Sequence, residues 1–384
     1  MKCGCSGFFI LCVIAASIVS ITGCGSKPQE PFFSETVVFR SGDDGYHTFR
    51  IPSVIVTQKG TLLAFCEGRK KGSSDTGDID IVLRRSSDNG ATWSPLEIIW
   101  DDGENVCGNP CPVIDCDTGT IWLVLTYNLG VDSEHEIMEG KSEGTRTVWL
   151  MKSVDDGTTW SAPLEITGTA KKSGWTWYAT GPGVGIQLKK SGRLVIPCDY
   201  ADKESGEWGS HVIYSDDHGS SWKIGGTLYP KCNECQAIER SDGSVLINMR
   251  SYHGLNRRAI ATSSDGGVTW SAVTQDDTLI EPVCQASLLR YTGLGDGERN
   301  RVLFSNPADK QRIKMTVRLS YDDCSAWPVE KLLYEGPSAY SCLTVLPDKS
   351  IGCLYEKGRE NAYETITFAV FNLEWLTDGA DWIR

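Results

Sequence analysis

A short motif that recurs along the chain constrains the fold more than any other feature. The pattern Ser-x-Asp-x-Gly-x-Thr/Ser-Trp occurs four times, at Ser86–Trp93, Ser153–Trp160, Ser215–Trp222 and Ser263–Trp270. A fifth copy, Ser320–Trp327, is degenerate, because Cys324 replaces the glycine and Ala326 replaces the hydroxyl residue. Successive copies begin 48 to 67 residues apart, which is room for one small sheet and a variable loop. The chain is therefore predicted to be a repeat of one structural unit.

The residue types of the motif predict a hairpin turn. The aspartate can accept backbone N–H bonds inside a tight turn, and the glycine can adopt positive φ. The tryptophan can bury a large ring between neighbouring sheets. A strand-like run such as Ile79–Arg85 precedes each copy. Small antiparallel sheets repeated around an axis form a β-propeller, and a first strand near Thr36–Arg40 paired with a last one near Thr365–Leu373 would close the ring.

The charge balance narrows the choice of ligand. The formal net charge is −13, from 37 basic and 50 acidic residues, so the broad basic face that nucleic acid requires is not expected. A few arginines gathered in one pocket can still bind a small anion, because charges act strongly at short range. No nucleic-acid partner is predicted, and an anionic small ligand remains open.

The N-terminus has the pattern of an export signal. Lys2 is the only charged residue before Lys27, and an apolar run extends from Phe8 to Ile21. This run is too short for a confident transmembrane helix, so residues 1–23 are predicted to be a signal peptide. The sequence ending at Cys24 resembles a bacterial lipobox, which implies lipidation of that cysteine, a tether over 24–32 and a folded domain over 33–384. The protein is thus expected to be a membrane-anchored bacterial lipoprotein at the outer membrane, cell surface or periplasm; an ordinary secretory signal with a chance cysteine is the alternative.

The cysteines do not predict a disulfide framework. Fifteen are present, and eleven lie beyond Cys24, an odd number scattered among predicted strands. The pairs Cys107/Cys111 and Cys232/Cys235 have spacings that suggest zinc, but no histidine lies near either pair at ligand spacing. Most of these cysteines are expected to be small apolar core residues. No metal and no obligatory cofactor is predicted.

Charged and aromatic motifs lie between the repeats, where half-buried strands should carry few charges. They are Phe49-Arg50-Ile51-Pro52, Glu67-Gly68-Arg69, the segment 74–80 with Asp75, Asn233-Glu234-Cys235-Gln236, Asn248-Met249-Arg250, Arg312, Ala339-Tyr340-Ser341 and Tyr355-Glu356-Lys357-Gly358. Their order and spacing, interleaved with the repeat, resemble the sialidases of bacteria and animals over nearly the whole mature chain. The repeat itself resembles their Asp-box, or BNR, repeat. The resemblance implies an all-β, six-bladed β-propeller with the Asp-boxes on the face away from the active site.

The resemblance also implies a binding site for the sialic acid carboxylate. Arg50, Arg250 and Arg312 would form the arginine triad, because planar guanidinium groups bind a carboxylate through charge-assisted hydrogen bonds that lysine does not reproduce. Arg318 competes with Arg312 for the third place, because both have the same strand parity. Glu356 resembles the carboxylate that pairs with the first arginine and offsets the repulsion among the three cations.

The same resemblance assigns the catalytic roles. Tyr340 would be the nucleophile and Glu234 its general base, since a neutral phenol avoids repulsion by the substrate carboxylate. Asp75, in the polar loop 72–77, is the candidate acid, with Asp78 and Asp80 as rivals. Arg69 is expected to contact the C4 substituent. The aromatic cluster Trp175, Trp177 and Tyr178 would either line the substrate side or pack in the core.

The expected activity is hydrolysis, with retention, of terminal α-linked sialic acids from sialylated glycans or glycolipids. Two other reactions on the same site stay open: an intramolecular trans-sialidase, and a hydrolase for the deaminated analogue of sialic acid. A sugar-binding propeller without catalysis is the alternative from another class, although it predicts the loss of Tyr340, Glu234 or Asp75, and all three are present. Cys235 and Cys342 depart from many relatives; both are small, so only packing around the site is expected to change.

Overall fold

The protein is all-β and propeller-like. The computed structural model describes residues 1, 2, 4 and 27–383, so most of the predicted signal peptide 1–23, and Cys24 with it, lie outside the described residues. In the described part, the strands form four hydrogen-bonded sheets accompanied by short helices. The helices are α1 (Glu134–Glu139), α2 (Thr167–Ala170) and α3 (Leu373–Leu376). Among the described residues, no helix is both long and apolar enough to cross a bilayer.

The first sheet combines two antiparallel groups. Its order is β2-β3-β4-β6-β7-β8-β9, with β5 paired to β4, and a single parallel pair, Ile79 with Val106, joins the two groups. The bounds are β2 Thr48–Val56, β3 Leu62–Arg69, β4 Ile79–Ser86, β5 Glu97–Trp100, β6 Val106–Ile114, β7 Ile121–Asn128, β8 Thr147–Ser153 and β9 Leu164–Glu165.

The two middle sheets each form one antiparallel group. One has the order β10-β12-β13-β14 with β11 paired to β12, and the other has the order β15-β16-β17-β18. The bounds are β10 Trp175–Thr180, β11 Ile186–Gln187, β12 Leu194–Asp202, β13 Trp208–Ser215, β14 Lys223–Leu228, β15 Cys232–Glu239, β16 Val245–Ser251, β17 Arg257–Ser263 and β18 Thr274–Ile280.

The last sheet contains both ends of the folded chain. Its order is β1-β24-β23-β22-β21-β20-β19, and β1 pairs with β24 antiparallel, as the sequence predicts. The long strand β22 pairs with β21 through its first half and with β23 through its second half. The bounds are β1 Phe33–Arg40, β19 Ser287–Thr292, β20 Arg301–Pro307, β21 Ile313–Ser320, β22 Val329–Val345, β23 Ile351–Lys357 and β24 Thr365–Phe371.

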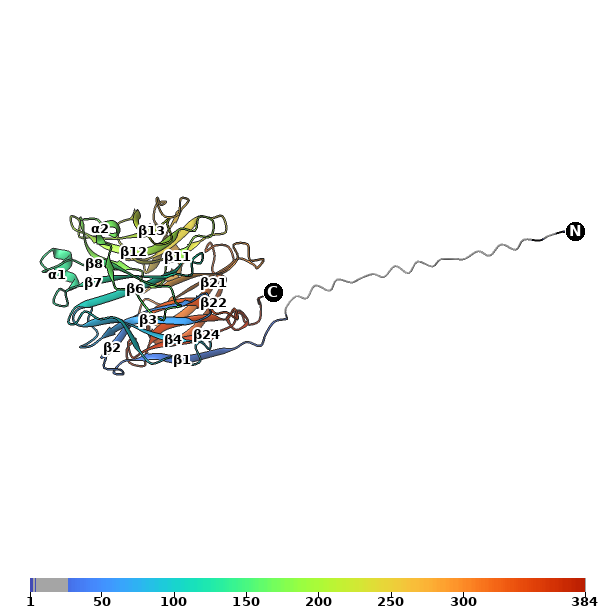
Figure 1. The fold of residues 1–384 in the computed structure, drawn as a ribbon, viewed down its shortest axis with the longest axis horizontal. Helices are drawn as coiled ribbons and strands as arrows, with labels where there is room; N and C mark the ends of the chain where they lie inside the picture. The colour runs from blue at the N-terminus through green and yellow to red at the C-terminus, as the bar shows by residue number, and fades with distance from the viewer. Residues whose placement is uncertain (3, 5–26, 384) are drawn as a thin grey trace.

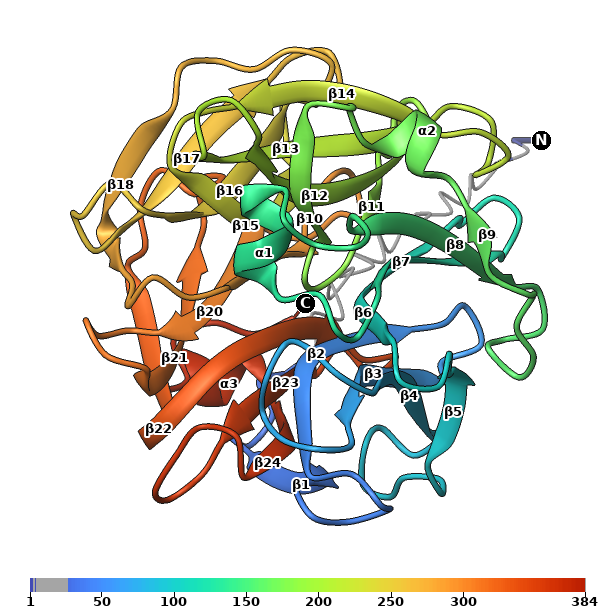
Figure 2. The same cartoon turned by 90° about the vertical axis from the view of Figure 1, so that its left-hand side faces the viewer.

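The sheets are arranged radially. Figure 2 shows the strand groups around a common centre, with β2, β6, β10 and β15 toward the middle and α1 on the face toward the viewer. In Figure 1 the strands β1 and β24 lie together along one edge of the body. The segment before β1 also contacts the body, because the N–H groups of Gln29 and Phe32 donate to Glu374 and Asn372 near α3. The contacts of the last sheet and α3 therefore extend to residues before position 33.

Each Asp-box forms a turn that satisfies its own polar groups. In the first copy, the N–H of Gly90 donates to Ser86 Oγ at 2.9 Å, and Asp88 accepts from both the backbone and the hydroxyl of Thr92. Gly90 has φ +86°, and a Cβ there would lie 2.4 Å from the ring of Phe368. Both the backbone conformation and the lack of space therefore require glycine at this position. The degenerate copy keeps the two backbone bonds, from Cys324 N–H to Ser320 Oγ and from Ala326 N–H to Asp322 Oδ1, because Cys324 adopts φ +72° without being glycine. It lacks the hydroxyl bond, because Ala326 has no hydroxyl group.

The Asp-boxes and the site motifs lie at opposite ends of the strands. The loop with Asp75 precedes β4 and the first box follows it, and an eight-residue strand spans roughly 25 Å. The box tryptophans pack against neighbouring strand groups: Trp93 meets Phe368 of β24 edge-to-face at 5.4 Å, and Trp160 meets Phe65 of β3 at 5.6 Å. The boxes therefore fasten adjacent sheets together on the side remote from the site.

Candidate active site

Irregularities in the inner strands aim side chains at one cavity. The register shifts between Arg50 and Ser53 in β2, between Gly108 and Cys111 in β6, between Cys232 and Cys235 in β15, and between Ser338 and Ser341 in β22. Such bulges locally end the alternation of the strand and turn a side chain out of the ladder. Arg50, Asn109, Glu234 and Tyr340 lie within these shifts, and all four line the same cavity.

The cavity has a volume of about 320 Å³ and a mostly polar lining. Six of the residues predicted from the sequence line it: Arg50, Asp75, Glu234, Arg250, Arg312 and Tyr340. The other two predicted residues, Arg69 and Glu356, are buried behind this lining and contact residues that belong to it. The arrangement brings together residues from one end of the chain to the other.

Tyr340 and Glu234 form the central pair of the cavity. The hydroxyl of Tyr340 donates to Glu234 Oε1 at 2.5 Å. Arg250 Nη1 contacts both residues, at 2.8 Å from Glu234 Oε2 and 3.3 Å from Tyr340 Oη. Burial and the nearby Glu234 raise the pKa of Tyr340 well above its usual value, although Arg250 opposes this. The resting phenol is therefore protonated, with a carboxylate in place to accept its proton.

Glu356 connects the first arginine to the tyrosine. It is fully buried, and its Oε1 accepts from Arg50 Nε at 2.8 Å and from the backbone of Ile51 at 3.0 Å. Its Oε2 accepts from the backbone N–H of Tyr340 at 3.0 Å. Burial alone would lower the pKa of Arg50, but Glu356, together with Tyr363 and Tyr340, outweighs burial and the pKa lies well above its usual value. Arg50 is thus a fixed cation.

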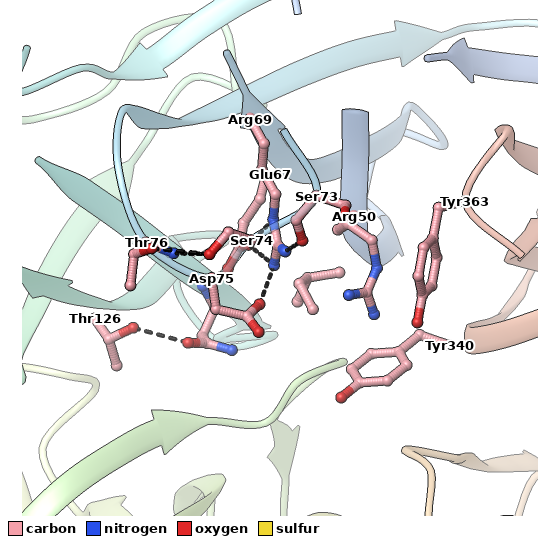
Figure 3. Close-up of polar contacts among 12 residues, drawn as sticks. Arg50, Glu67, Arg69, Ser73, Ser74, Asp75, Thr76, Thr126, Tyr340 and Tyr363 are labelled. Atoms are coloured by element: carbon pink, nitrogen blue, oxygen red, sulfur yellow. Dashed lines mark hydrogen bonds and ion pairs between the residues drawn. The ribbon is translucent and has the colours of Figure 1, made fainter. Parts of the chain in front are cut away.

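Two tyrosines flank the Arg50 guanidinium. Its central carbon lies 4.0 Å from the ring centre of Tyr363 and 5.0 Å from that of Tyr340. Figure 3 shows the guanidinium beside the rings of Tyr363 and Tyr340. Such cation–π contacts orient a guanidinium and leave its edge free for an anion.

The cavity contains Arg312 and not Arg318. Arg312 Nη1 donates to Tyr363 Oη at 2.9 Å, and Arg312 lines the cavity with Arg50 and Arg250. Arg318 lies elsewhere, where it contacts Asn306 at 3.4 Å and Glu330 at 3.3 Å. The structure thus places three guanidinium groups around one space, which suits a planar anion.

Asp75 lines the cavity from the loop before β4. Its Oδ1 is 2.6 Å from Arg69 Nη2, and Arg69 also contacts Glu67 Oε2 at 2.6 Å and the Ser73 carbonyl (Figure 3). Burial opposes the ionisation of Asp75, but the charges of Arg69 and Arg50 outweigh it and lower the pKa of Asp75 below its usual value.

The rival acids and two of the aromatic candidates lie outside the cavity. Asp78 and Asp80 both contact Lys70 Nζ at 3.1 Å. Trp175 packs in the core against Tyr200, with ring centres 4.0 Å apart, and Tyr178 belongs to the same core cluster. Only Trp177 of the aromatic cluster lines the cavity.

Several cavity residues were not identified from the sequence. They are Asn109, Glu134, Arg146, Asp199, Trp208, Tyr252 and Tyr363, with Glu67 at the base. Arg146 is 3% exposed, lies 4.0 Å from the ring of Trp177, and donates to Thr126 at 2.9 Å. Burial, followed by the proximity of Glu234, raises the pKa of Asp199 well above its usual value. A charged residue within or beside a buried strand was the available signal for both, whereas Arg50 and Arg250 were assigned through the motifs of the family resemblance.

None of the described cysteines lines the cavity. All eleven described cysteines are free, and only Cys116 is exposed. Cys235 and Cys342 are buried, with their Sγ atoms beside the backbone carbonyls of Cys198 and Val54. In the described part of the chain, one group of side chains has metal-ligand spacing, Asp115 with Asp117 and His218, and none of these lines the cavity.

Comparisons with known proteins agree with the arrangement. The BNR repeat-like domain model matches residues 60–354. A sialidase of Bacteroides fragilis is 34% identical, covering 89% of this chain and 68% of its own length. A sialidase of Micromonospora viridifaciens is 32% identical over 95% of this chain, which spans 59% of that protein. Among solved structures, a Hadza microbial sialidase superposes with a TM-score of 0.80 at 33% identity, covering 89% of this chain and 69% of that one.

Proposed function

The chain belongs to the sialidase family of enzymes with BNR repeats, and we propose that it is an exo-α-sialidase that releases terminal sialic acids from glycans or glycolipids. Because the chain spans only 59% of the Micromonospora sialidase, substrate and reaction are inferred from its own cavity. The observation that carries the proposal is the Tyr340–Glu234 hydrogen bond of 2.5 Å inside a cavity bordered by three arginines.

The arginines bind the substrate carboxylate in this proposal. Sialic acid carries its carboxylate on the anomeric carbon, and Arg50, Arg250 and Arg312 offer guanidinium groups on one space. Glu356 holds Arg50 and, through the backbone of Tyr340, fixes the distance between the carboxylate site and the phenol. The substrate is thereby oriented with its anomeric carbon over Tyr340.

The first chemical step transfers the sugar to the protein. Tyr340 Oη attacks the anomeric carbon while its proton passes to Glu234, so the negative charge of a carboxylate nucleophile is avoided. The bond to the leaving oxygen breaks, and Asp75 donates the proton that this oxygen requires. The product is a glycosyl-tyrosine and a free aglycone.

The second step returns the protein to its resting form. A water molecule loses a proton to the Asp75 carboxylate and attacks the anomeric carbon, and Tyr340 recovers its proton from Glu234 as it leaves. Two inversions at one carbon give net retention. Asp75 must begin the cycle protonated, and its lowered pKa in the free protein therefore predicts an acidic optimum.

The test is release of a fluorescent phenol from an aryl α-sialoside by residues 25–384, followed by NMR of the sugar product. Free sialic acid appearing first as the α-anomer supports the proposal. An anhydro sugar would instead identify an intramolecular trans-sialidase, and preference for the deaminated sugar would change the substrate. Sialoside binding by the folded protein without release would make it a non-catalytic propeller and overturn the proposal.

We also propose that the fold has six blades. The grouping that supports it is β2–β5, β6–β9, β10–β14, β15–β18, β19–β21 with the first half of β22, and the second half of β22 with β23, β24 and β1. A crystal structure of residues 25–384 tests the count, and five or seven groups around the axis would refute it.

We further propose that Cys24 carries a lipid that anchors the protein to a membrane. The support is the lipobox-like sequence Ile21-Thr22-Gly23-Cys24 after an apolar run. Mass spectrometry of the N-terminal peptide from the full chain should show a diacylglyceryl cysteine, and Cys24→Ala should release the protein from the membrane fraction. An unmodified N-terminus at another residue would indicate an ordinary secretory signal.

A further inference from the structure

The connection between β18 and β19 contacts three parts of the cavity at once. We call residues Glu281–Gln285 the bridging segment. The Val283 carbonyl accepts from Arg312 Nη2 at 3.4 Å, and Cys284 packs in one buried cluster with Tyr340. Gln285 bonds the backbone next to Tyr340 twice, because its amide donates to the Ser341 carbonyl and accepts from the Ser341 N–H, each at 3.0 Å.

The same segment also holds the strand that presents Arg250. Glu281 Oε1 accepts from the backbone N–H of Ser251 at 2.7 Å, immediately after Arg250. Neighbouring bonds support this contact, because the side chain of Asn306 donates to the Ile280 carbonyl at 2.8 Å. The bridging segment thus lies between two arginines of the cavity and the tyrosine.

A fully buried ion pair fixes the bridging segment. Arg258 of β17 and Glu281 are both 0% exposed, and Arg258 Nη1 lies 2.7 Å from Glu281 Oε2. The same nitrogen donates to the Cys284 carbonyl at 2.7 Å, so one guanidinium bonds two residues of the bridging segment. Arg258 Nε donates to Asn248 Oδ1 at 2.6 Å, and Asn248 lies on β16 two residues before Arg250.

The backbone of the bridging segment needs such a restraint. Val283 has φ +54°, a left-handed conformation that is strongly disfavoured for a β-branched residue. Backbone in such a region persists only when its surroundings hold it there. The strained residue is the one whose carbonyl faces Arg312.

We propose that Arg258 and Glu281 are positioning residues that set the separation of Arg250, Arg312 and Tyr340. The inference rests on the proposed sialidase function, since it assigns to the pair the geometry of the carboxylate site. Neither residue lines the cavity, so they act through the bridging segment and not by touching substrate.

A second buried ion pair provides the matched control. Arg301 and Asp381 are 1% and 10% exposed at their side chains and form two contacts, of 2.8 and 2.7 Å. Neither residue lines the cavity, and the other partners of Arg301 are Thr292, Glu298 and the Trp382 carbonyl. Removal of either pair should destabilise the fold, whereas only the first should change substrate binding.

The experiment compares full-length wild type, Arg258→Met/Glu281→Gln and Arg301→Met/Asp381→Asn. We would measure thermal midpoints, kcat and KM on an aryl α-sialoside, and the Kd of free sialic acid by calorimetry, all at a temperature where each variant is folded. We expect both double variants to have lower midpoints. Only Arg258→Met/Glu281→Gln should raise KM and Kd by about tenfold or more, because sub-ångström errors in a binding geometry cost that much.

Unchanged KM and Kd in folded Arg258→Met/Glu281→Gln would overturn the inference. If this variant does not fold, Arg258→Lys replaces it, because lysine keeps the charge beside Glu281 but cannot bond Glu281, the Cys284 carbonyl and Asn248 together. A KM equal to that of wild type would again overturn the inference. An inactive wild type would refute the proposed function separately, and the Kd comparison would still decide the positioning role.

Discussion

Polar side chains at the two ends of the strands find their hydrogen-bond partners at very different separations in the sequence. At the Asp-box end, Asp88 finds its partners within four residues, and the other intact copies repeat the same bonds. At the cavity end, Tyr340 bonds Glu234 across 106 residues of sequence, and Arg50 bonds Glu356 across 306. Because the bonds of an Asp-box lie within one turn, the motif can recur along the chain and can lose a member without affecting the other turns. The bonds at the cavity join residues far apart in the sequence, so the geometry of the site depends on all the sheets that supply it. Substitutions at the cavity end should therefore lower activity, whereas substitutions at the Asp-box end should leave activity unchanged.

The largest effect expected from this contrast is on the tyrosine. Tyr340→Phe should lower kcat by at least about a thousandfold, because it removes the proposed nucleophilic atom. Tyr291→Phe is the matched control, since both tyrosines are 6% exposed and Tyr291 Oη bonds the Lys349 carbonyl outside the cavity. Initial rates on an aryl α-sialoside and thermal midpoints of both variants check the prediction. Comparable rates for the two variants would contradict it.

A smaller effect is expected from the third arginine. Arg312→Lys should raise KM by about ten- to hundredfold, the value of one charge-assisted contact of roughly 1.5–3 kcal/mol. Arg318→Lys should have a lesser effect, because Arg318 contacts Asn306 and Glu330 and not the cavity. Steady-state kinetics of both variants decide between them, and a larger rise in KM for Arg318→Lys would reverse the assignment.

The pH profile should respond to the arginine beside the candidate acid. Arg69 lowers the pKa of Asp75, so Arg69→Gln should raise it and keep the acid protonated to higher pH. The alkaline limb of kcat/KM should therefore move upward in pH. Lys70→Met is the control, because Lys70 contacts Asp78 and Asp80 instead. A limb that stays in place, or moves downward, in Arg69→Gln would exclude Asp75 as the acid.

The smallest effect on catalysis is expected at the Asp-box end. Bonds from Thr92 and Ser86 lower the pKa of Asp88 from 3.8 to about 2. Because the pKa of Asp88 is lower in the folded state than in the unfolded state, ionised Asp88 stabilises the folded state above pH 3.8. This contribution disappears as the pH falls toward 2. Asp88→Asn should therefore lower the thermal midpoint slightly at neutral pH and not near pH 2, with kcat/KM unchanged. Thermal melts between pH 2 and 7 test this; an equal deficit at every pH would point to lost packing.

The local motif is the part of the fold that sequence could predict. Each Asp-box contains its own hydrogen-bond partners, so its spacing indicated the all-β repeat and the pairing of the first and last strands. The motifs around Arg50, Glu234 and Tyr340 were found through family resemblance, and their meeting in one cavity depends on bulges. A bulge is defined by the register with a neighbouring strand, and no local pattern records that register.

Strand β10 shows what a sequence pattern alone cannot predict. Trp175 and Trp177 are two residues apart, so a regular strand would direct both to the same face. The register shifts between Trp175 and Tyr178, and Trp175 packs in the core while Trp177 lines the cavity. Arg146 was missed for a related reason, because its partners come from other strands and no motif surrounds it.

The pairing of β1 with β24 has a consequence for biosynthesis. Arg50 is made 306 residues before its partner Glu356, and β24, which pairs with β1 in the last sheet, follows Glu356. A growing polypeptide therefore holds Arg50 without its counter-ion and Tyr340 without its backbone support until Glu356 has been made. Products that end before Glu356 lack both contacts of the candidate site.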